Sequence, residues 1–183
     1  MRLIERLAIV LVSLAIAIGV ILLLSGAPLT GHDSPGLRGP TNQIGLRFRD
    51  QGDRHLKPGA KLPRYDSNPA TSGAHVPTAI RSDESMISNN QLLQALELGN
   101  VVVMYGTRRP PRDLRRLAAS IAAPFTPALA AAGQAVILAR RPGTRGLLAL
   151  AWTRLLHVRS AADHQLRSFI LLWLGHGAPR SHN

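Results

Sequence analysis

The segment Ser88-Asn-Asn-Gln-Leu-Leu-Gln-Ala-Leu-Glu-Leu-Gly-Asn-Val-Val-Val-Met-Tyr105 decides the fold, because a helical pattern in it gives way directly to a strand. Ser88 or Asn89 is a suitable N-cap, and Gly99 is a suitable helix end. The run Val101-Val-Val-Met-Tyr105 is short, continuous and β-branched, which is typical of a buried strand. We therefore predict a helix that leads through Asn100 into the interior of a sheet.

The chain downstream repeats both kinds of element. Pro110 and Pro111 open a second helix that runs to about residue 123. Residues 135–139 and 147–152 are apolar strands, and the composition of residues 140–146 between them is typical of a hairpin loop. A last helix is expected from its cap at about Ser160 to Leu174. This order predicts one small α+β domain, with a mixed or antiparallel sheet of three to four strands and about three helices.

The N-terminal residues predict a membrane segment. Residues 7–27 carry no charged side chain, and at about 1.5 Å per residue they span about 31 Å as a helix. Arg2 and Arg6 precede this span, so the positive-inside rule places the N-terminus in the cytoplasm and the domain outside. We interpret residues 1–27 as a single-pass signal-anchor. A cleaved signal peptide is the alternative, although Pro28 would follow the small residues at its cleavage site.

Residues 28–52 form a tether rich in proline and glycine between this anchor and the domain, which we place at residues 53–179. Within the tether, the run Ile44-Gly-Leu-Arg-Phe-Arg49 alternates apolar and basic residues and predicts an edge strand.

The composition excludes several kinds of function. The chain has no cysteine, so disulfides, Cys-based zinc sites and a thiol nucleophile are absent. The net charge of +12 suggests nucleic-acid binding, but no zinc finger, RNP motif or glycine-rich phosphate loop accompanies it. We therefore expect a basic surface and no nucleic-acid partner.

A basic patch is expected around the second helix, and its members are Arg108, Arg109, Arg112, Arg115 and Arg116. The three helical arginines lie opposite an apolar side formed by Leu114, Leu117, Ala118 and Ile121. A solvated face is the first interpretation. Electrostatic binding of anionic lipid or another polyanion is the alternative.

The segment from Tyr65 to Pro77 combines turn formers, hydroxyl groups and a histidine more densely than any other. Its defining members are Tyr65, Pro69, Thr71, Ser72, Gly73 and His75. Proline fixes φ and glycine permits positive φ, so the segment predicts a defined turn. In the structural interpretation, His75 hydrogen-bonds backbone groups of its own turn. Ser72 has no nucleophile elbow around it, which argues against a hydrolase.

The segment Pro69-Ala-Thr-Ser-Gly-Ala-His75, with Tyr65 before it, resembles the signature of the DUF3105 family. That family consists of bacterial proteins that are mostly membrane-anchored or exported, and its mark is Tyr followed by Pro-Pro-Thr-Ser-Gly-Pro-His. The resemblance implies an extracytoplasmic domain on the bacterial cytoplasmic membrane.

Further landmarks of the family agree along residues 53–179. They are the upstream histidine at His55, the strand tryptophan at Trp152 and the aspartate that opens the last helix at Asp163.

The resemblance also implies a difference in the helix. The family reads about His-x-x-Glu-His-Gly there, whereas this chain has Gln94, Glu97, Leu98 and Gly99, so two motif histidines are replaced. Positions 94 and 98 share one helix face, and paired histidines on such a face can hold a metal. The remaining set is His55, His75 and Glu97, a candidate site for a transition metal. Alternatively, Glu97 caps its helix or pairs with an arginine.

Three functions stay open at this point. The first is a non-catalytic accessory or interaction subunit that binds another membrane or extracytoplasmic protein, and the sequence favours it over an enzyme. The second is a metal-binding protein or metalloenzyme that uses His55, His75 and Glu97. The third is electrostatic binding through the basic patch.

Overall fold

The computed structural model describes residues 44–179. The predicted membrane segment and most of the predicted tether lie outside these residues. Within residues 44–179, no helix is long and apolar enough to cross a membrane.

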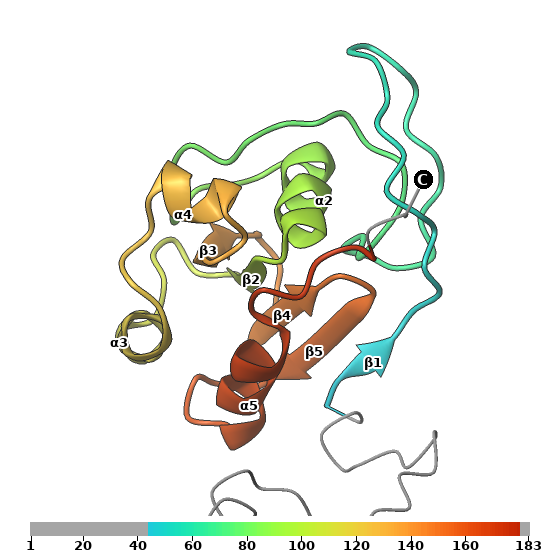
Figure 1. Cartoon of the computed structure of the whole chain (residues 1–183). Coiled ribbons are helices and arrows are strands. Elements are labelled where there is room, and N and C mark those ends of the chain that lie inside the picture. Colours follow the sequence, from blue (N-terminus) through green and yellow to red (C-terminus); the bar gives the residue numbers. More distant parts are fainter. Residues whose placement is uncertain (1–43, 180–183) are drawn as a thin grey trace, which may run out of the picture. The chain divides into compact units, whose positions relative to one another are not determined.

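The described part of the chain is an α+β domain with five strands and four helices (Figure 1). The strands are β1 (Leu46–Arg47), β2 (Val101–Tyr105), β3 (Val136–Arg140), β4 (Leu147–Ala151) and β5 (Arg154–Val158). The helices are α2 (Asn89–Leu98), α3 (Arg112–Ile121), α4 (Pro127–Ala131) and α5 (His164–Trp173). The prediction of three to four strands and about three helices therefore did not include β5 and α4.

The sheet is mixed, with the order β1-β5-β4-β2-β3. Strands β2 and β3 are parallel and are joined through α3 and α4, while the other neighbouring pairs are antiparallel. The predicted hairpin of β3 with β4 is wrong, because β2 lies between these strands and pairs with both. The loop at 140–146 instead crosses the end of β2, where Arg141 N–H donates to the Tyr105 carbonyl.

The hairpin in this half of the chain joins β4 to β5, through Trp152 and Thr153. Thr153 adopts a φ of 59°, a left-handed conformation that Gly or Asn usually supplies in a turn. Because no Gly, Asn or Pro marks this turn, the sequence pattern did not indicate β5. The predicted edge strand at 44–49 is confirmed by β1, which pairs with β5.

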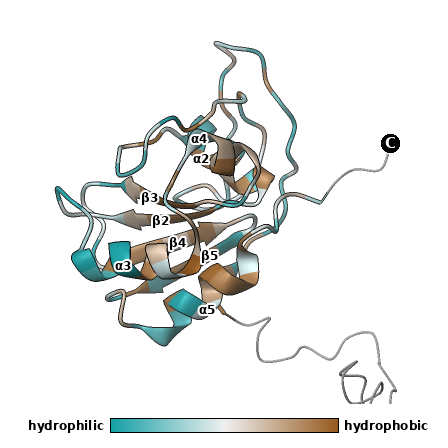
Figure 2. Ribbon diagram, turned by 60° about the vertical axis from the view of Figure 1, so that its left-hand side comes forward, coloured by the Kyte–Doolittle hydropathy of each residue, from teal (hydrophilic) through white to brown (hydrophobic). Residues whose placement is uncertain are grey.

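Helices cover both faces of the sheet (Figure 2). Alternate residues of β2 belong to two hydrophobic cores: Val101, Val103 and Tyr105 to one, and Val102 and Met104 to the other. The first core contains α3 and α5, and the second contains α2 and α4. A strand that is covered on both faces is apolar throughout, which explains the continuous valine run.

The helix ends follow the capping rules. Ser88 and Gln91 form a reciprocal capping box at the start of α2, and Gly99 ends that helix with a φ of 106°. Helix α5 begins at His164 with Asp163 as its N-cap, so its start is later than the predicted Ser160. Helix α4 has the favourable Thr126-Pro127 start but only five residues, too few for a clear helical period.

Candidate metal centre

The segment from Pro69 to His75 is buried throughout, although it forms no regular element. Gly73 has a φ of 124°, and a Cβ atom there would meet the Tyr65 ring at 3.0 Å. The Tyr65 hydroxyl donates to the Ala74 carbonyl at 3.0 Å. Tyr65 therefore covers the turn and fixes the backbone that precedes His75.

The segment before the turn runs alongside it in parallel, and this pairing brings two histidines together. His75 N–H donates to the Arg54 carbonyl, and Leu56 N–H donates to the His75 carbonyl, so His55 and His75 form an isolated parallel bridge. The two imidazole rings meet edge to face, with their centroids 5.4 Å apart. Residues that are 20 apart in the sequence thus present their side chains at one point.

The last turn of α2 supplies a carboxylate at the same point. Nε2 of His55 lies 3.0 and 3.1 Å from the two oxygens of Glu97 and donates to them. Nε2 of His75 lies 3.1 Å from Oε2 of Glu97. The ligand atoms of the three side chains lie within 4.8 Å of one another. The predicted capping or arginine pairing of Glu97 is therefore wrong, because its carboxylate faces the two histidines.

The hydrogen bond on the other ring nitrogen decides the tautomer of His75. Its Nδ1 lies 3.0 Å from the Gly73 carbonyl oxygen, which can only accept, so Nδ1 carries a proton. In the neutral ring, Nε2 then presents a lone pair toward Glu97. The structural interpretation of His75, hydrogen bonding within its own turn, is confirmed by this contact, and the same contact leaves Nε2 available as a ligand.

Nε2 of His75 is fully buried and makes no hydrogen bond among the described residues, despite its 3.1 Å approach to Glu97. A buried polar atom without a partner is unfavourable. A lone pair that faces a carboxylate oxygen at this distance therefore calls for a cation between them, either a proton or a metal ion.

The comparisons with known proteins bear on this domain as a whole. The family model described as a protein of unknown function (DUF3105) matches residues 55–181, more than half of the chain. The chain belongs to the DUF3105 family. The comparisons with curated proteins and with solved structures gave no match.

Two polar residues of this DUF3105 domain hold the site in place, and sequence reasoning gave neither of them this role. The Asn90 side-chain oxygen accepts from Val76 N–H, which attaches α2 to the end of the turn. The Ser72 hydroxyl donates to the Arg49 carbonyl and accepts from Gln51 N–H, so it bridges the upstream segment and the turn. The Ser72 hydroxyl is thus occupied by backbone groups of the upstream segment.

A polar cleft of about 310 Å³ opens beside Glu97. Its other lining residues are Asp53, Leu98, Gly175, Gly177 and Ala178. Because Glu97 reaches this cleft and half of the His55 side chain is exposed, small molecules in solution have access to the cluster.

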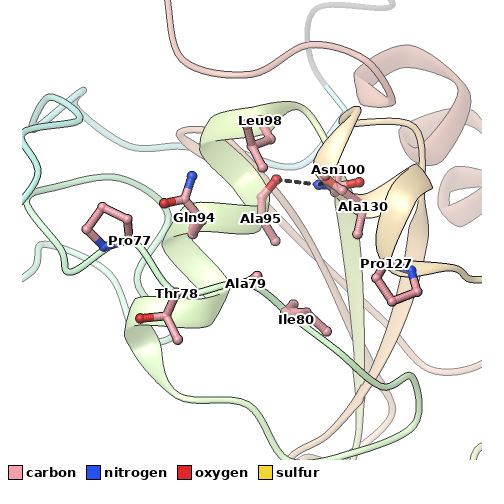
Figure 3. Close-up of a pocket in the computed structure, with 11 residues that line it drawn as sticks. Pro77, Thr78, Ala79, Ile80, Gln94, Ala95, Leu98, Asn100, Pro127 and Ala130 are labelled. Carbon is pink, nitrogen blue, oxygen red and sulfur yellow. Dashed lines mark hydrogen bonds between the residues drawn. The ribbon is translucent and has the colours of Figure 1, made fainter.

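An apolar cavity of about 300 Å³ lies on the neighbouring side of α2, between that helix, the segment 77–80 and α4 (Figure 3). Gln94 and Leu98 both line it, and Leu98 also lines the polar cleft. Leu98 therefore separates the apolar cavity from the surroundings of Glu97.

One of the five arginines of the predicted basic patch forms an ion pair with an acidic residue. Arg108, Arg109, Arg112 and Arg116 are exposed, whereas Arg115 makes a two-pronged ion pair with Glu84, with both contacts at 2.6 Å. This hydrogen bonding to Glu84 raises the pKa of Arg115. The ion pair ties α3 to the segment before α2.

Proposed function

We propose that this domain binds one divalent first-row transition-metal ion, with zinc as the first candidate, through His55, His75 and Glu97. The observation that carries the proposal is the convergence of their ligand atoms within 4.8 Å, with a buried Nε2 of His75 that lacks a hydrogen bond. Imidazole nitrogen with a carboxylate oxygen is a set that zinc and other divalent transition metals prefer.

The geometry supports this proposal in two further ways. Ligand atoms on one tetrahedral zinc ion, at about 2.0 to 2.1 Å each, are separated by about 3.3 Å. The two histidine nitrogens lie 3.0 and 3.1 Å from Glu97 Oε2, close to this separation, and all three ligand atoms lie within 4.8 Å of one another. The Nδ1–H of His75 donates to a backbone carbonyl, the contact that usually orients a metal-bound imidazole.

Three protein ligands leave one position of a tetrahedral ion open. Structural zinc sites are closed by four protein ligands, whereas sites that act on small molecules retain such a position. Here the polar cleft at Glu97 lies beside the cluster. We infer that the bound ion would exchange ligands with the solution, and that the domain presents it outside the membrane, at the end of the predicted tether.

We also propose that the chain is a divergent member of its family. Gln94 and Leu98 stand where the motif described above has histidines, and a leucine side chain cannot bind a metal. The proposed site therefore contains fewer imidazoles than the family motif allows. A role as an accessory subunit of a membrane complex is compatible with this site, and metal binding is the part that geometry supports.

The test is a zinc titration of the full-length protein in neutral detergent, after removal of metal with EDTA and in competition with a chromophoric chelator. We expect one zinc ion per chain and a loss of affinity of about 100-fold or more in Glu97→Gln and in His55→Gln. The matched control is His157→Gln, because His157 is exposed on β5. Both site variants alter partly exposed side chains, so folding should persist, and circular dichroism checks it.

A proton shared by His75 and Glu97 would satisfy the same atoms. In that case the titration would show no stoichiometric binding, or equal affinities in the site variants and in His157→Gln. Either result would overturn the proposal.

A further inference from the structure

Two arginines face each other at the edge of the sheet. Arg47 of β1 and Arg154 of β5 are directly opposite in the antiparallel pair. Residues opposite each other project from the same face, and like charges in such a pair are unfavourable. Among residues 44–179, no ion pair neutralises either of them.

The aromatic surroundings leave the Arg154 guanidinium free to donate. The group stacks on the Trp173 ring at 4.6 Å from the ring centroid, and a stacked guanidinium keeps its N–H groups available at its edge. Nε of Arg154 and Nε1 of Trp173 are both buried, and neither has a hydrogen-bond partner among the described residues. Two buried donors beside a second positive charge call for an acceptor.

The side chains of Arg154 and Trp173 line a cleft of about 220 Å³, together with Arg47, Trp152 and His176. Asp50 also lines it, and its negative charge offsets one of the two arginines. Its Oδ1 accepts from Gly52 N–H and its Oδ2 accepts from the Trp152 indole. Burial lowers the pKa of Arg154, and the charge of Arg47 adds to that effect. The cleft thus combines a net positive charge with unsatisfied donors.

We propose that this cleft binds a small oxyanion through Arg47, Arg154 and the Trp173 indole, and that its ligand is a phosphate group, either free or on a lipid. Arginine matches phosphate oxygens with paired, charge-assisted hydrogen bonds. Drug-sized ligands need about 300 to 1,000 Å³, so a cleft of this volume suits a single phosphate group better than a nucleotide. The proposal does not rest on metal binding, although Gly177 lines both clefts.

The chain contains its own reporter, because both of its tryptophans line this cleft. The test is a titration of the full-length protein in neutral detergent with inorganic phosphate, at constant ionic strength and with EDTA present, followed by tryptophan fluorescence. We expect a saturable change, and an affinity that falls by about tenfold or more in Arg47→Gln and in Arg154→Gln. The matched control is Arg108→Gln, which removes an exposed arginine elsewhere and should leave the affinity unchanged.

Parallel titrations with dihexanoyl phosphatidic acid and dihexanoyl phosphatidylcholine identify the source of the phosphate. Tighter binding of phosphatidic acid than of inorganic phosphate indicates a lipid headgroup, and the reverse order indicates a free anion. Fluorescence that does not saturate with either phosphate or phosphatidic acid would overturn the proposal. So would equal affinities in Arg47→Gln, Arg154→Gln and Arg108→Gln.

Discussion

The Nε2 atom of His75 lies 3.1 Å from Oε2 of Glu97, in a position where the imidazole is fully buried and the carboxylate reaches a cleft. The contact joins an irregular turn to the last turn of α2. This distance depends on the conformation of both segments. A substitution that changes the backbone of the turn should therefore weaken the site.

Gly73→Ala should disturb the site through its backbone. Gly73 has a φ of 124°, and a Cβ atom there would meet the Tyr65 ring at 3.0 Å. We expect the free energy of unfolding to fall by about 1 to 3 kcal/mol, and zinc affinity to fall with it. The measurements are urea unfolding and the zinc titration.

Gly59→Ala is the control for backbone strain alone. Gly59 also has a positive φ, of 83°, but no atom lies within 4 Å of its Cβ position. It should lower stability less than Gly73→Ala and leave zinc affinity unchanged. Equal effects of the two substitutions on zinc affinity would show that the Tyr65 contact does not position His75.

Asn100→Ala should destabilise the fold strongly. The Asn100 amide donates to the Ala95 and Ala130 carbonyls and accepts from Ala135 N–H, so it joins α2, α4 and the start of β3. Its removal leaves the Ala135 N–H without a partner, while the Ala95 and Ala130 carbonyls each lose one bond and still accept from Asn100 N–H and Gly133 N–H. We expect a loss of about 1 to 3 kcal/mol in urea unfolding.

Asn89→Ala removes an exposed asparagine from the first turn of α2 and serves as the control. It should change the free energy of unfolding by no more than about 0.5 kcal/mol. Losses of similar size in both variants would contradict the role of Asn100.

Asp83→Asn should change the pH dependence of stability. Burial raises the pKa of Asp83 above its ordinary value of 3.8, although Leu138 N–H donates to its carboxylate. As the pH rises past 3.8, the unfolded chain therefore loses this proton before the folded chain does, and the contribution of Asp83 to stability declines until the folded pKa is passed. Asparagine keeps the acceptor oxygen and removes this decline.

The measurement is urea unfolding of Asp83→Asn and the unsubstituted protein across pH 3.5 to 7. The free energy of unfolding of the variant, relative to the unsubstituted protein, should increase from low pH to neutral pH. A relative stability that decreases over this range would contradict the assigned cause.

Leu98→His should strengthen zinc binding. Leu98 lines the cleft beside Glu97, and its side chain is 42% exposed, so an imidazole can replace it without loss of core packing. A further imidazole would fill the open position of the proposed ion, and we expect affinity to rise by about tenfold or more. Leu171→His, at an exposed leucine on α5, is the control. An unchanged affinity in Leu98→His would place that position outside the site.

Local patterns predicted the elements that carry their own signals. The N-cap at Ser88, the glycine end at Gly99 and the valine run of β2 are encoded within a few residues, and all three are present. The apolar side of α3 also packs on the core as predicted. The turn at Thr153 carries no such signal, since its positive φ occurs in a residue that rarely adopts it.

Strand pairing was beyond the reach of local patterns. The loop at 140–146 has the composition of a hairpin loop, but the strands that it joins, β3 and β4, lie on either side of β2. The insertion of β2 between them depends on its burial on both faces of the sheet. The cluster of His55, His75 and Glu97 was named from sequence through a resemblance. Its convergence depends on the parallel pairing of two irregular segments, which hydrophobic periodicity does not describe. Metal binding itself stays a prediction.

The most direct test of the central claim is a long-range ¹H–¹⁵N spectrum of the full-length protein, labelled with ¹⁵N-histidine, before and after one equivalent of zinc. The chain has seven histidines. We predict that only Nε2 of His55 and Nε2 of His75 move to the shift of metal-bound nitrogen, while Nδ1 of His75 stays protonated against Gly73. Zinc-dependent shifts confined to the other histidines, or no shift at all, would contradict the account.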